Sequence, residues 1–261
     1  MCGIVGYVGK RNCTDVLING LSKLEYRGYD SAGIAVFQDG KIAVAKSKGR
    51  LKDLEDKMER EGRPVGHVGI GHTRWATHGE PNYINSHPHT SEQGKIALVH
   101  NGIIENYVEI KDFLISRGVH FCSDTDTEVV AQLLEYYYLI SGDLLGSVYK
   151  VLDRIEGAYA LGILCADMPD TFIAARKDAP LLLGYGEGCN FIASDVTAII
   201  KHTRDISYMD DGEVAVVTAD EIQVFDALGQ PVEKQHSYVD WDVSAAEKGG
   251  YCLLYTSPSP R

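Results

Sequence analysis

The chain has 261 residues, 44% of them hydrophobic, and its 25 Lys and Arg residues stand against 37 Asp and Glu residues for a net charge of −12. A chain of this length and composition can bury a full core as one large globular domain, or at most two small ones. Its acidic surface repels phosphate backbones and anionic lipids, so we expect neither nucleic acid nor a membrane among its partners.

The N-terminal part of the chain predicts mostly strands. Apolar residues over 14–24 are spaced for one face of a helix, and Asp39-Gly40 between two apolar runs favours a two-residue hairpin turn. Runs of small, β-branched and alternating residues predict strands over 3–8, 32–38, 41–47, 67–75 and 95–101.

Helices come next, followed by a second group of strands. One helix is predicted over 105–118, a second over 129–140 after the capping-box pair Thr125 and Glu128, and a third over 143–155. Because strands cluster with strands and helices with helices, the sequence predicts an α+β fold with antiparallel sheets flanked by helices. The later strands are predicted over 158–166, 171–177, 180–186, 190–195, 213–219 and 221–227.

The chain opens with MCGIVG, which places a cysteine at the second position. An initiator methionine before a small residue is normally removed, so the mature chain would begin with Cys2 and carry a thiol and a free α-amine on one residue. The pKa of such an amine is about 7.8 and that of a thiol about 8.5, so near neutral pH the amine is partly an uncharged base that can take the thiol proton. The sequence therefore indicates a nucleophile that needs no histidine partner.

Polar, glycine-rich segments at the ends of predicted strands are candidates for a functional site, because rigid elements would hold their side chains in place. Taken one at a time, each segment also has a structural explanation. Arg27, Gly28 and Asp30 suit a turn with a local ion pair, Arg74 and Trp75 a surface cation–π contact, Asn101-Gly102 a turn, and Asp126 a helix N-cap.

The six cysteines contain no C-x-x-C pair and are too sparse for a disulfide framework, so we expect reduced thiols and a cytoplasmic protein. The sequence contains no run of about 18 apolar residues and no signal-peptide pattern, which fits the same expectation. His87 and His89 are candidate metal ligands, but no paired ligand motif accompanies them. We expect no metal and no cofactor.

Taken together and in order, the segments MCGIVG, LEYRGYDSAG, HTRWATHGEP, HNGIIENY and SDTDTEV resemble the glutaminase domain of the isomerising glutamine:fructose-6-phosphate aminotransferases. These enzymes are a branch of the class II glutamine amidotransferases, and the resemblance runs from Cys2 to about Tyr251. It implies the four-layer αββα sandwich of the N-terminal-nucleophile hydrolases, with two antiparallel sheets flanked by helices. It also implies hydrolysis of L-glutamine through a Cys2 thioester, with the ammonia used to form glucosamine-6-phosphate from fructose-6-phosphate.

The resemblance assigns a role to each polar segment. Cys2 is the nucleophile with its α-amine as general base, the side-chain amide of Asn101 and the backbone N–H of Gly102 form the oxyanion hole, and Arg27 helps to order the N-terminus. The substrate-binding residues are Arg74 for the α-carboxylate of glutamine, Asp126 for its α-ammonium group, and Trp75, Thr77 and His78, which line and close the pocket.

The resemblance also predicts a domain boundary near residue 240. We expect a glutaminase domain over 2–240 and, over 241–261, a truncated linker and an anomalous tail without periodic pattern that ends in CLLYTSPSPR. The sugar-phosphate isomerase domains that follow in the family are absent from this sequence. We expect the full-length enzyme, with that half present, to be a homo-oligomer.

Two other functional classes stay open on the residues alone. The chain would fit a different amidase or a self-processing peptidase of the same N-terminal-nucleophile architecture, since Cys2 alone does not select glutamine. It would also fit an inactive module that binds glutamine without hydrolysing it. The joint presence of Cys2, Arg74, Asn101, Gly102 and Asp126 argues against the inactive module.

Overall fold

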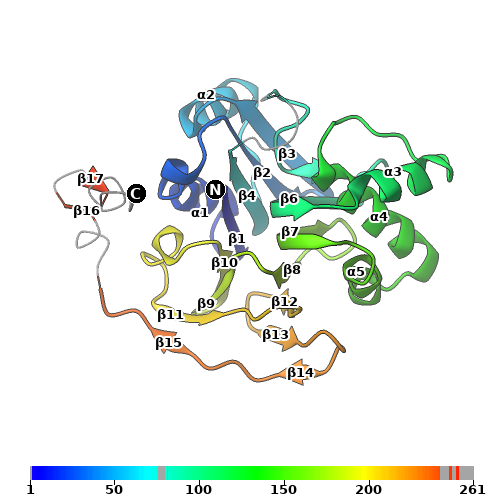
Figure 1. Ribbon diagram of the computed structural model, residues 1–261. Coiled ribbons are helices and arrows are strands. Elements are labelled where there is room, and N and C mark those ends of the chain that lie inside the picture. Colours follow the sequence, from blue (N-terminus) through cyan, green and yellow to red (C-terminus); the bar gives the residue numbers. More distant parts are fainter. Residues whose placement is uncertain (1, 76–79, 81, 242–246, 249–250, 253–261) are drawn as a thin grey trace, which may run out of the picture.

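The computed structural model describes residues 2–75, 80, 82–241, 247–248 and 251–252. Within these residues, two antiparallel β-sheets pack face to face, and helices cover the outer face of each sheet (Figure 1). The predicted four-layer αββα sandwich of an α+β protein is therefore confirmed. Most of the predicted tail, residues 242–246, 249–250 and 253–261, lies outside the described residues.

The first sheet has the N-terminal strand near its centre, in the order β15-β11-β9-β10-β1-β4-β2-β3. Gly3 at the start of β1 lies opposite Thr73 of β4, so Cys2 enters the sheet beside the end of β4 that carries Arg74. The strands are β1 (Gly3–Gly9), β2 (Ser31–Gln38), β3 (Lys41–Lys48), β4 (Val68–Arg74), β9 (Leu182–Gly186), β10 (Cys189–Ala193), β11 (Asp205–Tyr208) and β15 (Ser237–Tyr238).

The second sheet has the order β14-β13-β12-β8-β7-β6-β5. Its long central pair is β6 and β7, which run antiparallel from the Ile96–Cys165 pair to the Ile104–Gly157 pair. The strands are β5 (His89–Thr90), β6 (Ile96–Ile104), β7 (Gly157–Cys165), β8 (Phe172–Lys177), β12 (Val214–Val217), β13 (Ile222–Phe225) and β14 (Pro231–Val232). A separate short pair consists of β16 (Glu247–Lys248) and β17 (Tyr251–Cys252).

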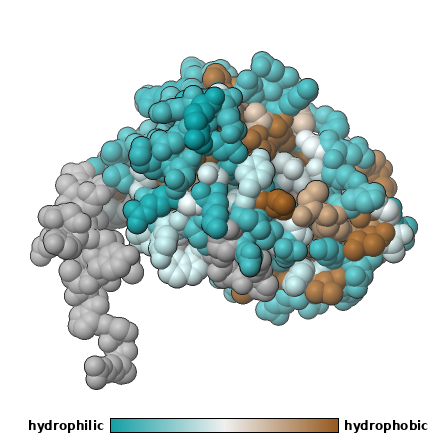
Figure 2. Space-filling model, turned by 90° about the horizontal axis from the view of Figure 1, so that it is seen from above, coloured by the Kyte–Doolittle hydropathy of each residue, from teal (hydrophilic) through white to brown (hydrophobic). Residues whose placement is uncertain are grey.

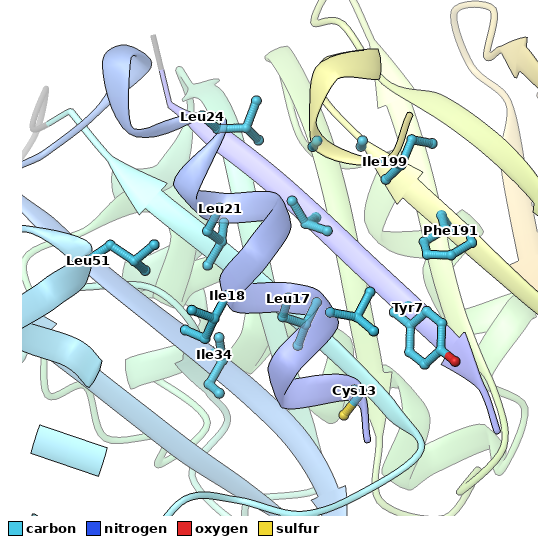
Figure 3. Packing of buried hydrophobic residues seen from close by; sticks show 14 of the residues in the cluster. Tyr7, Cys13, Leu17, Ile18, Leu21, Leu24, Ile34, Leu51, Phe191 and Ile199 are labelled. Atoms are coloured by element: carbon cyan, nitrogen blue, oxygen red, sulfur yellow. The ribbon is translucent and has the colours of Figure 1, made fainter. Parts of the chain in front are cut away.

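The helices divide between the two outer faces (Figure 1). Helices α1 (Cys13–Ser22) and α2 (Leu51–Glu61) pack on the first sheet, and α3 (Tyr107–Ile115), α4 (Asp126–Ser141) and α5 (Leu144–Leu152) pack on the second. Short 3-10 helices span Glu25–Arg27 (η1) and Val196–Ala198 (η2). Figure 3 shows Leu17, Ile18 and Leu21 of α1 packed over Tyr7 and Ile34 of the sheet, as expected for apolar residues spaced along one helical face.

The core between the two sheets positions the candidate site. Ile4 of β1, Ile70 of β4 and Val99 of β6 belong to this buried inter-sheet cluster. Side chains alternate between the faces of a strand, so residues at even spacing from these three face the same interior. Near the end of the sandwich, those residues are Cys2, Arg74 and Asn101.

Most predicted elements are confirmed. The two-residue strands β5, β14 and β15 were not predicted, and neither were two longer elements, α2 and β11. The Asp39-Gly40 hairpin is present, with φ of 50° and 77° at its two turn residues. Helix α2 was not predicted, because charged residues dominate it and only Leu51, Leu54 and Met58 reach the core. Strand β11 was also missed, since its sequence DISY has no apolar run and Ile206 is its only buried hydrophobic residue.

The surface is largely polar. Figure 2 shows a mostly hydrophilic face on which hydrophobic residues are scattered. Within the part of the chain that the structure describes, no helix is long and apolar enough to cross a membrane. The cysteines with described side chains, Cys2, Cys13, Cys122, Cys165 and Cys189, are free thiols.

Candidate active site

A cavity of about 300 Å³ opens where β1 begins and β4 ends, beside the second half of β6. Nearly all the sequence-predicted site residues that the structure describes line this one cavity. Its polar lining includes Cys2, Arg74, Asn101 and Asp126, and its apolar lining includes Ile103, Ala158, Ala179 and Pro180. Such a mainly apolar cavity with a few converging polar groups is the usual form of a small-molecule site.

Cys2 is held by the chain that follows β4. The backbone N–H of Trp75 donates a hydrogen bond to Cys2 Sγ at 3.2 Å, and the thiol lies 3.5 Å from the Trp75 carbonyl oxygen. Burial raises the pKa of the Cys2 thiol. The hydrogen bond from the Trp75 N–H favours the thiolate and lowers this pKa, but its effect is smaller than that of burial. Burial therefore leaves this thiol less ionised than a free cysteine, so the sulfur needs a base to become a nucleophile.

The segment YRGYD follows η1 and packs directly against the end of β4. The backbone N–H of Asp30 donates to the Arg74 carbonyl at 3.2 Å, and a Cβ on Gly28 would lie 2.6 Å from the Arg74 carbonyl carbon. Only glycine allows this approach, so the segment supports the strand end that holds Arg74. The Arg27 side chain lies outside what the structure describes.

Asn101 and Gly102 lie inside β6, opposite Ala160 and Tyr159 of β7, so their interpretation as a turn is wrong. Asn101 Nδ2 donates to the Cys2 carbonyl oxygen at 3.1 Å, which places the amide next to Cys2. Gly102 has a φ of 137°, and a Cβ there would overlap the Ala158 carbonyl oxygen. Glycine is therefore required at this position by both conformation and space.

Arg74 and Trp75 differ sharply in exposure. Arg74 is 4% exposed, so it is not part of a surface cation–π pair, whereas Trp75 is 48% exposed at the mouth of the cavity. The Trp75 ring meets the Tyr29 ring edge-on at a centroid distance of 5.6 Å. The buried guanidinium and the exposed ring therefore provide an interior cation and an apolar rim.

Asp126 is the first residue of α4, and the N-cap is Thr125, so the N-cap interpretation of Asp126 is wrong. Thr125 accepts a hydrogen bond from the Glu128 N–H at 3.3 Å, as the capping-box spacing predicts. Asp126 is 6% exposed, and its Oδ2 accepts from the Ile104 N–H at 2.8 Å. This bond ties the start of α4 to the end of β6 and holds the carboxylate at the cavity.

Buried histidines behind the cavity were missed as site residues. His87 and His100 line it, and His72 contacts Asn101. Burial lowers the pKa of His72 to about 3, holds that of His87 well below its usual range, and also lowers that of His100 against the attraction of Asp126. The signal was present for two of them, since HTRW places His72 two positions before Arg74 and VHNG places His100 directly before Asn101.

Two predicted pocket residues, Thr77 and His78, lie outside the described residues. His87 and His89, considered as metal ligands, are stacked or edge-on to other imidazole rings instead. Among the residues that the structure describes, no group of three or more His, Cys, Asp or Glu side chains is arranged to hold a metal ion.

Sequence comparison identifies relatives along nearly the whole chain. Residues 73–201 match a family model described as a glutamine amidotransferase domain. The chain is 57% identical over 251 residues to the isomerizing glutamine–fructose-6-phosphate aminotransferase of Caldanaerobacter subterraneus subsp. tengcongensis, an alignment that covers 96% of this chain and 41% of the relative. Proteins of the same name from Thermus thermophilus and Aquifex aeolicus are 51% and 47% identical, over 96% of this chain and 41% and 42% of their own lengths. The chain thus spans about two fifths of the length of these relatives.

Solved structures share the fold. The glutamine phosphoribosylpyrophosphate amidotransferase of B. subtilis is 27% identical, with a TM-score of 0.74 over 87% of this chain and 49% of that one. A glutamine aminotransferase class-II domain protein from Silicibacter pomeroyi has the same fold at 13% identity, with a TM-score of 0.61 over 86% of this chain and 99% of that one. The expected N-terminal-nucleophile amidotransferase architecture is confirmed.

Proposed function

Since residues 73–201 match a family model of glutamine amidotransferase domains, we propose that the chain belongs to that family, that its cavity binds L-glutamine and that Cys2 hydrolyses the side-chain amide to glutamate and ammonia. One observation carries this proposal: the Cys2 thiol, the Asn101 amide and the Arg74 guanidinium line the same cavity although they come from three separate segments of the chain. A nucleophile, an oxyanion donor and a carboxylate-binding cation are the groups that this reaction requires.

The first step is deprotonation of the thiol. With Met1 removed, the α-amine of Cys2 accepts the proton, a step made necessary by the raised pKa of the buried thiol. The thiolate then attacks the amide carbon of glutamine and forms a carbon–sulfur bond. The carbon–nitrogen bond breaks, and the departing nitrogen takes a proton from the ammonium group and leaves as ammonia. Water next attacks the γ-glutamyl thioester, which releases glutamate and returns the thiol.

The tetrahedral intermediates carry a negative oxygen that needs hydrogen-bond donors already in place. We assign this role to Asn101 Nδ2 and the backbone N–H of Gly102. The 3.1 Å contact of Asn101 Nδ2 with the Cys2 carbonyl supports the assignment, because it sets the donor beside the attacking residue. Removing one such donor typically raises the barrier by about 3 kcal/mol.

Recognition of the amino-acid end of glutamine is assigned to two buried charges. Arg74 would bind the α-carboxylate in a two-pronged contact, and Asp126 would bind the α-ammonium group. Both are buried beside the cavity, where an ion pair with substrate is screened little by solvent. We further assign Trp75, Thr77 and His78 to closure of the pocket, and Arg27 to ordering the N-terminus.

The whole-protein activity is a wider proposal. We propose that residues 2–240 are the ammonia-supplying domain of an isomerizing aminotransferase, in which the ammonia would convert fructose-6-phosphate to glucosamine-6-phosphate. The names of the relatives, and their sequence identity of 47–57% over 96% of this chain, support it. That reaction requires the sugar-phosphate half of the enzyme, and we propose a homo-oligomer for the full-length protein and a cytoplasmic location.

An ammonia-release assay on the chain lacking Met1 tests the proposed function. We expect ammonia from L-glutamine and none from asparagine, from peptides or from simple acyl amides. Equal release from peptides or acyl amides would instead assign the chain to another N-terminal-nucleophile amidase. Calorimetric binding of glutamine without ammonia would identify an inactive binding module.

A further inference from the structure

We propose that His72 is a positioning residue, which holds the Asn101 side-chain amide with its NH2 group turned toward Cys2. The inference deepens the proposed function and rests on it, since the amide donor matters for catalysis only if an oxyanion forms at that place. His72 itself contacts no substrate atom in this account. It acts through Asn101.

The hydrogen bonds of His72 define which ring nitrogen carries hydrogen. His72 Nε2 lies 2.9 Å from Asn101 Oδ1 and 3.0 Å from the His100 carbonyl oxygen. The His100 carbonyl oxygen can only accept, so Nε2 must be the protonated nitrogen, and the same N–H also faces the Asn101 amide. The forked donor therefore fixes the neutral imidazole in one tautomer.

The same contact defines the orientation of the Asn101 amide. The two ends of an amide have nearly the same shape, so their hydrogen-bond partners decide which end points where. Oδ1 faces the donor on His72, and Nδ2 consequently faces the Cys2 carbonyl oxygen at 3.1 Å. A reversed amide would place Oδ1 beside the developing oxyanion, where it would repel negative charge.

The His72 ring is fixed by its strand and by stacking. His72 lies on the inner face of β4, at even spacing from the inter-sheet core residue Ile70, and its side chain is buried at 1% exposure. Its ring stacks on that of His87 at a centroid distance of 4.2 Å and an interplanar angle of 16°. His87 Nδ1 in turn accepts from the His100 N–H at 3.3 Å, so the stack is anchored to the backbone of β6 beside Asn101.

The surroundings also keep His72 uncharged. Its Nδ1 is buried and, among the described residues, has no hydrogen-bond partner. Protonation would therefore bury an unsatisfied N–H as well as a charge, and would do so near the Arg74 cation. A neutral imidazole that is protonated at Nε2 and unprotonated at Nδ1 can donate a hydrogen bond to one amide oxygen, as the proposed role requires.

Two substitutions separate this positioning role from packing. His72→Phe keeps a flat ring that can stack on His87 but removes the donor, whereas His72→Gln keeps an amide N–H that can reach the Nε2 position. We expect His72→Phe to lower kcat for glutamine hydrolysis about 100-fold, as expected for loss of one oxyanion donor, with KM changed less than about threefold. His72→Gln should recover most of kcat.

A double-variant comparison tests whether His72 acts through Asn101. We expect His72→Phe combined with Asn101→Ala to be no slower than Asn101→Ala alone, because the amide that His72 orients is already gone. Multiplicative losses in the double variant, or a KM rise with unchanged kcat in His72→Phe, would overturn the proposal. So would a His72→Gln variant that is as slow as His72→Phe while melting at the wild-type temperature.

A measurement that needs no catalysis separates failure of this inference from failure of the proposed function. In the ¹H–¹⁵N spectrum, the Asn101 side-chain NH2 signal is identified by its loss in Asn101→Ala. We expect slow solvent exchange of this signal in the wild type and His72→Gln, and faster exchange with a shifted position in His72→Phe. An unchanged signal in His72→Phe would refute the positioning role even if the wild type hydrolyses glutamine. Absence of ammonia release by the wild type with the expected spectra would refute the function alone.

Discussion

The backbone N–H of Trp75 donates a hydrogen bond to the sulfur of Cys2 at 3.2 Å, across 73 positions of sequence. The strand end that carries Arg74 therefore also touches the proposed nucleophile. In the proposed reaction, this one short segment would join substrate binding to attack, at the place where β1 and β4 run side by side.

The first prediction concerns that sulfur. Cys2→Ala should abolish ammonia release, because the thioester cannot form without the thiol. Cys122→Ala is the matched control, since Cys122 is exposed and lines a different pocket from Cys2. We expect the control to retain the wild-type rate in the same assay. Comparable ammonia release by the Cys2 variant would refute the mechanism.

Arg74→Lys should raise the KM for glutamine about tenfold or more while kcat falls by less, because a point charge replaces a planar fork that can bind both carboxylate oxygens. Steady-state kinetics of ammonia release measure both constants. Arg63→Lys serves as the control, because Arg63 pairs with Asp15 at 2.8 Å on the exposed surface. An unchanged KM in the Arg74 variant would mean that Arg74 does not hold the carboxylate.

Gly102→Ala should destabilise the fold by about 2 kcal/mol or more and eliminate most activity, because its φ of 137° and the nearby Ala158 carbonyl leave no room for a Cβ. Urea unfolding and ammonia release measure the two effects. Gly118→Ala is the control: Gly118 also has a positive φ, 87°, but a Cβ there meets nothing within 4 Å. We expect the control to lose less stability and no activity. Equal losses in the two variants would contradict the steric argument.

The buried histidines predict a dependence of stability on pH. The folded pKa of His72 is lowered to about 3, below its unfolded value, so between these values the unfolded state binds more protons and unfolding becomes easier as the pH falls. From pH 6.5 to pH 5, His72 alone should lower the free energy of unfolding by about 2 kcal/mol. Urea unfolding at the two pH values measures this change. In His72→Phe, the decrease in the free energy of unfolding between the two pH values should be smaller by about 2 kcal/mol. An equal decrease in the wild type and the variant would contradict the lowered pKa of His72.

Most strands and helices could be predicted from the sequence, because apolar residues recur in each of them at a regular spacing. The contacts at the cavity end of the sandwich could not be predicted in this way, because they join residues far apart in the chain. Asn101-Gly102 looks locally like a turn, and only its pairing with β7 makes it part of a strand. Asp126 looks like an N-cap, but Thr125 takes that position and leaves the Asp126 carboxylate to receive the Ile104 N–H.

The roles of the motif residues came from resemblance, whereas the residues that hold them needed the fold. His72 is two positions before Arg74 in the sequence, yet its partner Asn101 is on the other sheet. The hydropathy pattern gives no sign of such a contact, because histidine has the same hydropathy value whether it is buried or exposed. A pair of this kind becomes visible only when the inner faces of β4 and β6 are placed opposite each other.

The last prediction concerns the base. A fusion partner joined directly ahead of Cys2, and removable by a site-specific protease that leaves Cys2 first, should be inactive before cleavage and active afterwards. The peptide bond of the fusion removes the basic amine, and the raised pKa of the buried thiol leaves little thiolate to react without it. Ammonia release before and after cleavage of the same preparation measures the effect, and the intact mass establishes that the chain begins at Cys2. A fusion at the C-terminal end, cleaved in the same way, controls for the protease and the tag. Full activity of the uncut N-terminal fusion would mean that another group takes the thiol proton, and the α-amine would lose its assigned role.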